Sequence, residues 1–318
     1  MDRIAMLSRV VSSVVLVIGV LMTLRGPLVA AEPLPITEIA PGVFVHRGAY
    51  EDVNPRNRGD ISNIGFIVGE KVVAVIDTGN ARWLGDDLRA AIKTKTGLPI
   101  AYVINTHAHP DHIFGNAAFK GDKPEFVGHA KLEAEMRTKA PYYLQTLKTF
   151  VGEGATTGIE IIPPTKTVKA GDSIALDLGG RTLTITGYPT AHSESDVTVY
   201  DDKTQTLWAG DLLFVERAPA IDGSILGWVK AIAELKKIPA ARAVPGHGPA
   251  VVPWPQSLSA EERYFGLLLN DIRAIQKAHG KIEDATKTAG TEDKDRWALF
   301  DDYNARNVTA AFVELEWE

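Results

Sequence analysis

The sequence predicts an α/β fold: a four-layer αββα sandwich, with two β-sheets inside and helices outside, followed by a C-terminal helical extension. Three observations predict it. Apolar strand-like runs alternate with amphipathic helical segments between residues 42 and 254. A loop-like stretch rich in Gly, Thr and Pro at 152–164 divides this alternation into two similar halves. Beyond residue 255 the apolar residues recur at three- and four-residue steps, which is typical of helices.

The first half begins as an antiparallel meander and continues as strand–helix–strand alternation. Residues 32–41 are rich in proline, so we expect an irregular segment there. Strands are predicted at 42–46, 63–68, 72–76, 100–104 and 125–128, with a hairpin turn at 69–71. Helices are predicted at 84–94, through 113–119 and at 131–139.

The second half repeats this pattern and then becomes helical. Strands are predicted at 173–178, 181–186, 197–200 and 206–209, and a helix at 228–237 with Trp228, Ile232 and Leu235 facing inward. Beyond Pro255, one helix carries Phe265, Leu268, Ile272 and Ile275 and stops at Gly280, and a last helix carries Val308, Ala311, Phe312 and Leu315. We interpret both as packing helices rather than a cofactor site or a dimer seam. A part in walling a pocket or in oligomerisation stays open.

The N-terminus has the layout of a secretory signal peptide. Arg3 and Arg9 precede an apolar stretch at 10–24, and small residues end at Ala31, after which cleavage is expected. The apolar run is short for a spanning helix, which needs ~20 residues. An uncleaved membrane anchor is the alternative, because Arg25 is unusual just before a cleavage site. We predict an exported protein, periplasmic or secreted, that meets the membrane only transiently through this segment.

The composition restricts the chemistry of any site. The chain has 318 residues, of which 45% are hydrophobic, and a net charge of −6 without a basic run. A nucleic-acid partner is therefore not expected. The chain has no Cys, which excludes disulfides, a cysteine nucleophile, Fe–S clusters and thiolate metal ligands. A metal site must be built from nitrogen and oxygen donors.

Residues 106–112, Thr-His-Ala-His-Pro-Asp-His, place three imidazoles and a carboxylate directly after the apolar run 100–104. Buried His and Asp side chains need partners. Neutral imidazole with carboxylate is the usual ligand set for Zn²⁺ and similar divalent metals. A surface His-rich loop is the alternative, but α/β proteins usually build their sites at strand ends. The cluster therefore predicts a metal site.

The spacing within the cluster favours two metals. His107 and His109 are two residues apart, so on an extended backbone their side chains point to the same side. Pro110 favours extended backbone before it and a turn after it. The turn places Asp111 and His112 on a second arm, where Asp111 also fits an N-cap or first-turn position. Two such arms can hold two metals side by side.

The cluster and four further motifs, in the same order, resemble the metallo-β-lactamase-fold metallohydrolase superfamily. His-x-His-x-Asp-His is preceded by Val-Ile-Asp-Thr-Gly at 75–79. Ala-His-Ser at 191–193, Ala-Gly-Asp at 209–211 and Pro-Gly-His-Gly at 245–248 follow it. The joint match covers about residues 43–249 and is specific.

The resemblance implies the αββα sandwich and a dinuclear site. The implied ligands of one metal are His107, His109 and His192, and those of the second are Asp111, His112 and His247, with Asp211 bridging the two. The implied cofactors are two Zn²⁺, with iron or manganese as alternatives. Alone, Asp211 would fit the N-cap of a helix; among these motifs we favour the bridging ligand.

Two other polar residues and three further histidines need separate interpretations. Asp77 is either the acceptor for the second ring nitrogen of a metal-bound His or a turn cap. Asn116 either orients the cluster loop or caps. His46, His129 and His279 are assigned no functional role, with His279 placed at a helix C-terminus.

The resemblance to particular members of the superfamily bears on the substrate. β-Lactam hydrolases of this fold typically have Cys or Ser at the place of Asp211, and the lysine that Cys-type members carry shortly afterwards is missing, because 212–214 is Leu-Leu-Phe. A bridging Asp instead resembles thioester hydrolases of the glyoxalase II type, lactonases and phosphodiesterases. The stretch 216–224 and the Gly-His-Gly-Pro ending look like exported zinc metallohydrolases associated with sulfur oxidation or quinoprotein systems.

We therefore predict a zinc-dependent hydrolase of a small-molecule substrate. Two metals sharing a water lower its pKa from ~15.7 toward ~7, and the resulting hydroxide attacks the activated carbonyl of a thioester, a lactone or a related ester. Asp111 is the predicted catalytic residue, which orients the nucleophile and shuttles its proton. The predicted catalytic domain spans 32–254, after a signal peptide at 1–31 and before the helical extension 255–318, which packs on the same domain.

Three alternatives stay open. One is β-lactam hydrolysis on the same fold. Another is an iron-dependent sulfur or persulfide dioxygenase, which typically needs only His107, His192 and Asp211. The last is a non-catalytic periplasmic accessory protein that keeps its metal for structure. The substrate, the metal in vivo and the oligomeric state do not follow from the sequence.

Overall fold

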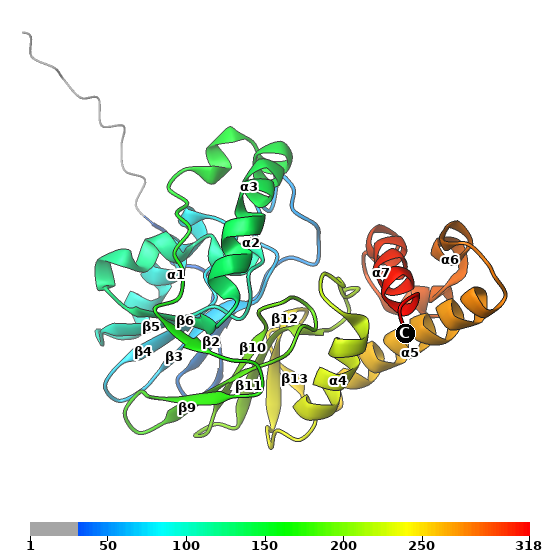
Figure 1. Ribbon diagram of the computed structural model, residues 1–318. Helices are drawn as coiled ribbons and strands as arrows, with labels where there is room; N and C mark the ends of the chain where they lie inside the picture. Colours follow the sequence, from blue (N-terminus) through cyan, green and yellow to red (C-terminus); the bar gives the residue numbers. More distant parts are fainter. Residues whose placement is uncertain (1–30) are drawn as a thin grey trace, which may run out of the picture. The chain divides into compact units, whose positions relative to one another are not determined.

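Two β-sheets pack face to face between outer helices in the computed structural model, which describes residues 31–318 (Figure 1). The first sheet has the order β1-β2-β3-β4-β5-β6-β7. Its strands are β1 (Thr37–Ala40), β2 (Val43–His46), β3 (Ile64–Val68), β4 (Val73–Ile76), β5 (Ile100–Ile104), β6 (Glu125–His129) and β7 (Lys166–Val168). The second sheet has the order β13-β12-β11-β10-β9-β8. Its strands are β8 (Ser173–Asp177), β9 (Thr182–Gly187), β10 (Val197–Asp201), β11 (Thr206–Phe214), β12 (Arg242–His247) and β13 (Val252–Pro253).

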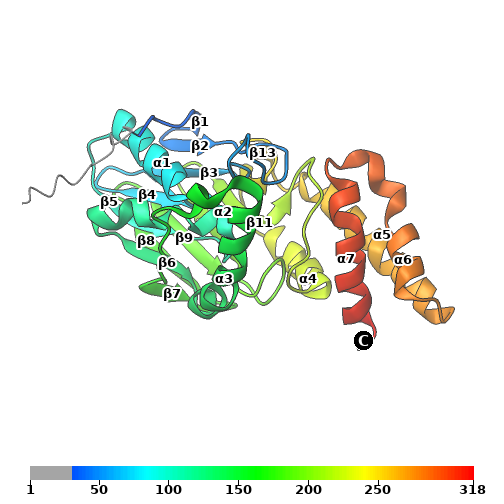
Figure 2. The same cartoon turned by 90° about the horizontal axis from the view of Figure 1, so that it is seen from above.

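The helices cover both outer faces, which confirms the predicted four-layer sandwich (Figures 1 and 2). They are α1 (Arg82–Lys95), α2 (Pro110–Ile113), α3 (Leu132–Val151), α4 (Ile225–Leu235), α5 (Leu258–Lys277), α6 (Ile282–Thr288) and α7 (Phe300–Leu315). Short 3₁₀ helices lie at η1 (Asn116–Asp122), η2 (Glu153–Thr156) and η3 (Thr291–Arg296).

Three apolar layers hold the sandwich together. Between the sheets, Ile76 and Ile104 belong to the same buried cluster as Trp208. On the outer face of the first sheet, α1 packs through Leu88. On the outer face of the second, α4 packs through Trp228, which is 0% exposed. Each such fully buried side chain contributes roughly 1.5–3 kcal/mol.

Parallel pairing directs several strand ends to one edge. β4, β5 and β6 run parallel in the first sheet, and β11 and β12 run parallel in the second. The carboxyl ends of parallel strands meet at the same edge of a sheet, where α/β proteins build their sites. The polar motifs at 106–112 and 245–248 therefore lie at this edge.

The predicted C-terminal helices are present and pack together beside α4 (Figures 1 and 2). Phe265, Leu268 and Val308 are buried, which confirms their assignment as packing positions.

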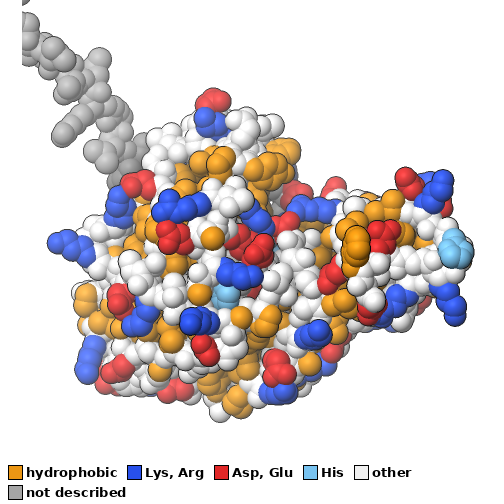
Figure 3. All heavy atoms as spheres, viewed as in Figure 1, with side chains coloured by type: hydrophobic (Ala, Val, Ile, Leu, Met, Phe, Trp, Pro, Cys, Tyr) orange, Lys and Arg blue, Asp and Glu red, His pale blue; other side chains and the backbone are white. Residues whose placement is uncertain are grey.

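No helix within 31–318 is long and apolar enough to cross a membrane. The predicted signal peptide lies outside the described residues, apart from Ala31. Figure 3 shows acidic and basic side chains interspersed over the face that it presents.

The helix predicted through 113–119 is wrong as a single element. The chain instead makes one α-turn in α2 and, after Gly115, the 3₁₀ helix η1. The cause is a close backbone contact: a Cβ on Gly115 would lie 2.0 Å from the Thr78 oxygen, and the Gly115 N–H donates to the Gly79 carbonyl at 2.9 Å. Asp111 stands in the first turn of α2, one of the two predicted positions.

Two helix ends also differ from the prediction. α3 continues through Pro141 to Val151 instead of ending near 139, because Met136 and Leu147 bury the same face before and after an exposed Pro141. α5 ends at Lys277, and the residue with positive φ after it is His279 (φ 58°), not Gly280.

One strand is present where an irregular segment was expected, and another is longer than predicted. Residues 32–41 are not wholly irregular, because Thr37–Ala40 lies between prolines and pairs antiparallel with β2 as β1. β11 continues past Ala209 to Phe214, because Gly210 adopts a positive φ of 54° and shifts the register against β12 instead of ending the pairing. Asp211 therefore lies inside a strand.

The contact at Gly115 predicts a test of this packing. Gly115→Ala should lower the free energy of unfolding by about 1–3 kcal/mol, because its Cβ meets backbone that cannot move aside. Gly121→Ala is the matched control, since a Cβ there meets nothing within 4 Å. Urea unfolding checks both; equal stability of the two variants would contradict the account.

Candidate metal centre

The candidate ligands come from five strands, helices and loops at the edge where the strands end. The segment after β5 carries His107 and His109, and α2 carries Asp111 and His112. The loop after β9 carries His192. β11 carries Asp211 and β12 ends at His247. The structure thus brings together all seven residues that the sequence predicted.

Glycines allow the backbones to approach this closely. A Cβ on Gly246 would lie 1.9 Å from Asp211 Oδ1, so only glycine leaves room for that carboxylate. Gly210, with its positive φ, lies against Thr106, where a Cβ would be 2.7 Å from the Thr106 Cβ. These two positions explain why small residues surround the Asp211 and His247 motifs.

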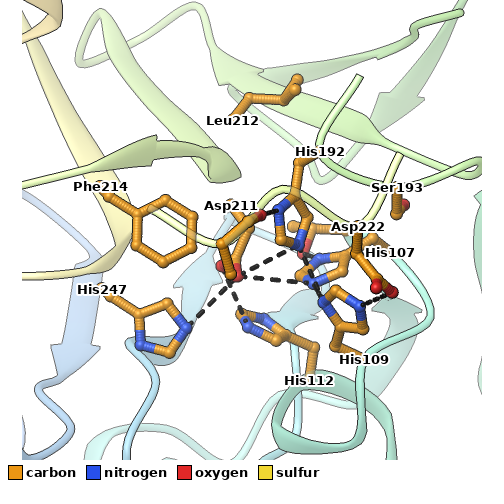
Figure 4. A network of polar contacts seen from close by, with 12 residues as sticks. His107, His109, His112, His192, Ser193, Asp211, Leu212, Phe214, Asp222 and His247 are labelled. Atoms are coloured by element: carbon orange, nitrogen blue, oxygen red, sulfur yellow. Dashed lines mark hydrogen bonds and ion pairs between the residues drawn. The ribbon is translucent and has the colours of Figure 1, made fainter. Parts of the chain in front are cut away.

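The ligand atoms form two groups, and Figure 4 labels all of these residues except Asp111. One group is His107, His109, His192 and Asp211, and the other is Asp111, His112 and His247; within each group the donor atoms all lie within 4.8 Å of one another.

Asp211 lies between the two groups. Its Oδ2 is 3.4 Å from His192 Nε2 and 3.3 Å from His247 Nε2. Its Oδ1 is 3.2 Å from His112 Nε2. The carboxylate therefore contacts histidines of both groups, as a bridging ligand would.

The outer nitrogens of the first group are occupied as donors. His192 Nδ1 donates to the Ala220 carbonyl at 2.8 Å. His109 Nε2 donates to Asp222 Oδ2 at 3.0 Å. His107 Nδ1 lies 3.0 Å from Thr106 Oγ1, whose own proton goes to Asp77 Oδ2 at 2.7 Å. Each of the three rings therefore turns an unprotonated nitrogen inward.

These inward nitrogens are too close for a site without a cation. His109 Nδ1 is 3.0 Å from His107 Nε2 and 2.8 Å from His192 Nε2, so three lone pairs face one another. Burial lowers the pKa of His107 well below its usual value, and lowers that of His192 to about 3. Both rings are therefore neutral near pH 7. The donor set fits a divalent metal such as zinc.

The second group also fits a cation. His112 Nδ1 donates to Asp77 Oδ2 at 2.8 Å, which directs Nε2 at Asp111 and Asp211. His112 Nε2 and Asp211 Oδ1 are both buried without a hydrogen-bond partner among the described residues. A cation between them would satisfy both atoms.

His247 has two neighbours at its outer nitrogen. Nδ1 is 2.8 Å from the Ile61 carbonyl and 2.6 Å from Arg217 Nη1. Because a carbonyl can only accept, the Ile61 contact favours a proton on Nδ1, and the Arg217 contact is then the less favourable of the two. Nε2 faces Asp111 Oδ2 and Asp211 Oδ2, each at 3.3 Å.

The structure also shows the partners of the other polar residues singled out in the sequence. Asp77 accepts from His112 Nδ1 and from Thr106, so it is a partner of a candidate ligand and not only a turn cap. Asn116 accepts from Thr78 Oγ1 and Asn105 Nδ2, which ties down the cluster loop. His46, which is bonded to Asp60 and the Pro35 carbonyl, lies outside both groups, as do His129 and His279.

A cavity of about 200 Å³ opens onto the candidate ligands. Tyr143 on α3 and Tyr303 and Arg306 on α7 line its walls, and Arg217, which is 3% exposed, also lines it. Of the C-terminal helices, α7 therefore forms part of the pocket wall.

Sequence reasoning missed these lining residues and Asp222, the hydrogen-bond partner of His109. The stretch 216–224 was singled out only for its resemblance to exported family members. A lone Asp, Tyr or Arg carries no spacing signal, because these side chains reach the pocket from distant segments.

The family comparison agrees with this fold and site. The model of the metallo-beta-lactamase superfamily matches residues 57–247, more than half of the chain, and the chain belongs to that superfamily. This confirms the resemblance found in the sequence. A comparison with curated protein sequences gives no match.

Similar solved structures have the same fold at low sequence identity. A metallo-beta-lactamase from Pontibacter korlensis is 21% identical, with a TM-score of 0.59 over 73% of this chain and 99% of that one. A metallo-beta-lactamase from Hirschia baltica is 20% identical, with a TM-score of 0.55 over 70% and 93%. The stereoselective inverting sec-alkylsulfatase Pisa1 from Pseudomonas sp. is 15% identical, with a TM-score of 0.67 over 88% of this chain and 50% of that one. This chain matches about half the length of the alkylsulfatase.

His112 predicts the pH dependence of the metal-free protein. Burial lowers its pKa, but Asp211, Asp111 and Asp77 outweigh burial and raise the pKa well above its usual value of 6.5. The proton on His112 therefore stabilises the fold fully below pH 6.5, and this stabilisation is lost as pH rises through the folded-state pKa.

We expect the unfolding free energy of the metal-free protein to fall as pH rises above 6.5, and to fall less in His112→Gln. Urea unfolding at several pH values in a chelating buffer measures this slope. The pKa of His46 is raised too, but His46 is present in both proteins and cancels in the comparison. An equal slope in both proteins would refute the role given to His112.

Proposed function

We propose that the protein is a dinuclear zinc-dependent hydrolase that cleaves an activated carbonyl substrate, namely a thioester, a lactone or a related ester. The observation that carries the proposal is the convergence of five histidine ring nitrogens on two buried carboxylates, in two groups that share Asp211. Two such groups of nitrogen and oxygen donors support the proposal of one divalent cation in each.

The residues that would hold the metals follow from these two groups. His107, His109 and His192 would hold one zinc, Asp111, His112 and His247 would hold the other, and Asp211 would touch both. When bound, the metals would supply a hydroxide nucleophile at neutral pH and polarise the substrate carbonyl.

Asp111 is the proposed proton acceptor of the reaction. Burial raises its pKa, but His112 and His247 outweigh burial and hold the pKa well below its usual range, so the side chain is a carboxylate at neutral pH. It lines the cavity and its Oδ2 lies 3.3 Å from His247 Nε2. From there it can orient the nucleophile and take its proton.

The pocket supports a small-molecule substrate. Its volume is about 200 Å³, and aromatic and cationic side chains line it beside the candidate ligands. Asp211, in the place where β-lactam hydrolases typically have Cys or Ser, favours the ester-like substrates over β-lactams. The similar structures named as metallo-β-lactamases and as an alkylsulfatase share the fold. The hydrolysis test therefore includes β-lactams and sulfate esters as competing substrates.

We also propose that the protein is exported, to the periplasm or beyond the cell. The support is the Arg-flanked apolar stretch at 10–24 with small residues up to Ala31. N-terminal sequencing of the protein isolated from its native cells would then begin at Glu32. A protein that begins at Met1 would contradict cleavage and favour an anchor.

The proposed function predicts two zinc ions per chain in the protein as purified. Elemental analysis measures this number, and a panel of thioesters, lactones, β-lactams, phosphodiesters and sulfate esters measures turnover. We expect thioester or lactone hydrolysis that a chelator abolishes and zinc restores. One iron per chain would favour the dioxygenase, and two zinc ions without hydrolysis of any panel member would favour an accessory role.

Asp111→Ala should lower kcat by about 10²–10⁴-fold, because it removes the proton acceptor. Asp295→Ala, which changes an exposed Asp outside the cavity, is the matched control. Zinc content and circular dichroism of both variants separate lost chemistry from lost structure. Wild-type kcat in a folded, zinc-loaded Asp111→Ala variant would exclude this role.

A further inference from the structure

We propose that the C-terminal helix α7 supports the metal site, because it is hydrogen-bonded to the loop that orients two of the three histidines of the first group. We call residues 219–225 the clamp loop, and Asp222 is its positioning residue. The inference rests on the proposed function, since it assumes that His109 and His192 bind a metal.

The clamp loop supplies the outer acceptors of both histidines. The Ala220 carbonyl accepts from His192 Nδ1 at 2.8 Å. Asp222 Oδ2 accepts from His109 Nε2 at 3.0 Å, a contact drawn in Figure 4. The backbone N–H of Asp222 also donates to the His192 carbonyl at 3.2 Å. The loop therefore fixes which nitrogen of each ring carries the proton and where the other nitrogen points.

The clamp loop has little regular structure of its own before α4, so other elements must hold it. α7 does so at three positions. Asn307 accepts from the Ile221 N–H at 2.9 Å and donates to the Pro219 carbonyl at 2.7 Å. Glu314 accepts from the Ile225 N–H at 2.8 Å and from the Ser224 hydroxyl.

The third contact reaches the positioning residue itself. Arg306 Nη2 donates to Asp222 Oδ1 at 3.0 Å. From the other side of the pocket, Lys139 on α3 donates to Asp222 Oδ2 at 2.8 Å. Asp222 is thus held by one cation from α3 and one from α7 while it accepts from His109.

Lys139 is itself anchored. It pairs with the buried Glu135 at 2.8 Å, and Glu135 accepts from the Ser195 hydroxyl in the turn that follows His192. Both ends of this chain of contacts therefore return to segments that carry candidate ligands. By contrast, the acceptor of His112 is Asp77, which is held within the first sheet by Thr106.

The two groups should therefore respond differently to a change in the clamp loop. Loosening the clamp loop should weaken zinc binding at the three-histidine group and spare the group formed by Asp111, His112 and His247. Loss of an outer partner of a metal-bound histidine typically costs about 10–100-fold in metal affinity.

The experiment measures zinc affinity by competition with a chromophoric chelator, using zinc alone as the probe and the full-length protein. We expect Asp222→Ala to weaken one of two zinc sites by about 10–100-fold and Asp222→Asn, which keeps one acceptor oxygen, to restore part of that loss. Arg306→Ala should weaken the same site by a smaller factor. Repeating the titration in an Asp111→Ala background, where the second group is impaired, assigns the effect to the three-histidine group.

Arg273→Ala is the matched control, because Arg273 is also a half-exposed arginine of the C-terminal helices but pairs with Glu318 instead of the clamp loop. Unchanged zinc affinity in Asp222→Ala and Arg306→Ala, with two zinc ions in the wild type, would overturn the inference. Equal weakening by Arg273→Ala would overturn it too, since the effect would then not pass through the loop. A wild type that binds no zinc would instead contradict the proposed function.

Discussion

The mutual repulsion of unprotonated histidine nitrogens is the constraint on which this structure depends. His107, His109 and His192 bring three lone pairs within about hydrogen-bond distance of one another, and each ring has its only proton committed outward. Buried polar atoms arranged in this way are unfavourable unless a cation lies among them. The three layers of apolar packing lie elsewhere in the molecule, and their stabilisation of the fold offsets this local repulsion.

The outward hydrogen bonds determine the site as much as the ligands do. Asp77 is buried directly after β4, accepts from His112 of the second group and also holds Thr106, the neighbour of His107. Asp222 lies a quarter exposed on a loop and accepts from His109 of the first group. Only the first group therefore depends on the loop that carries Asp222. The proposed role of the C-terminal helix α7 is to hold the loop that carries Asp222, through Arg306, Asn307 and Glu314.

The sequence predicts the candidate ligands and most of the strands and helices because the signals for them are local. The His-x-His-x-Asp-His cluster, the strand at 100–104 and the alternation of strands and helices are properties of short segments, and the structure has them in place. What the sequence did not predict depends on contacts between distant segments. The break at Gly115 depends on the Thr78 carbonyl, and the continuation of α3 through Pro141 depends on burial of Met136 and Leu147. Asp222 accepts from His109, 113 positions away, and is held by Lys139 and Arg306, which are 83 and 84 positions away.

The most direct test of the central claim is the position of the metals, observed by anomalous X-ray diffraction at the zinc edge on crystals of the protein purified without added metal. The account predicts two peaks, one among His107, His109 and His192 and one among Asp111, His112 and His247, with histidine nitrogens at about 2.0–2.1 Å. Asp211 should contact both peaks. No peak, or one peak that leaves either group with protonated, hydrogen-bonded histidines, would contradict the account.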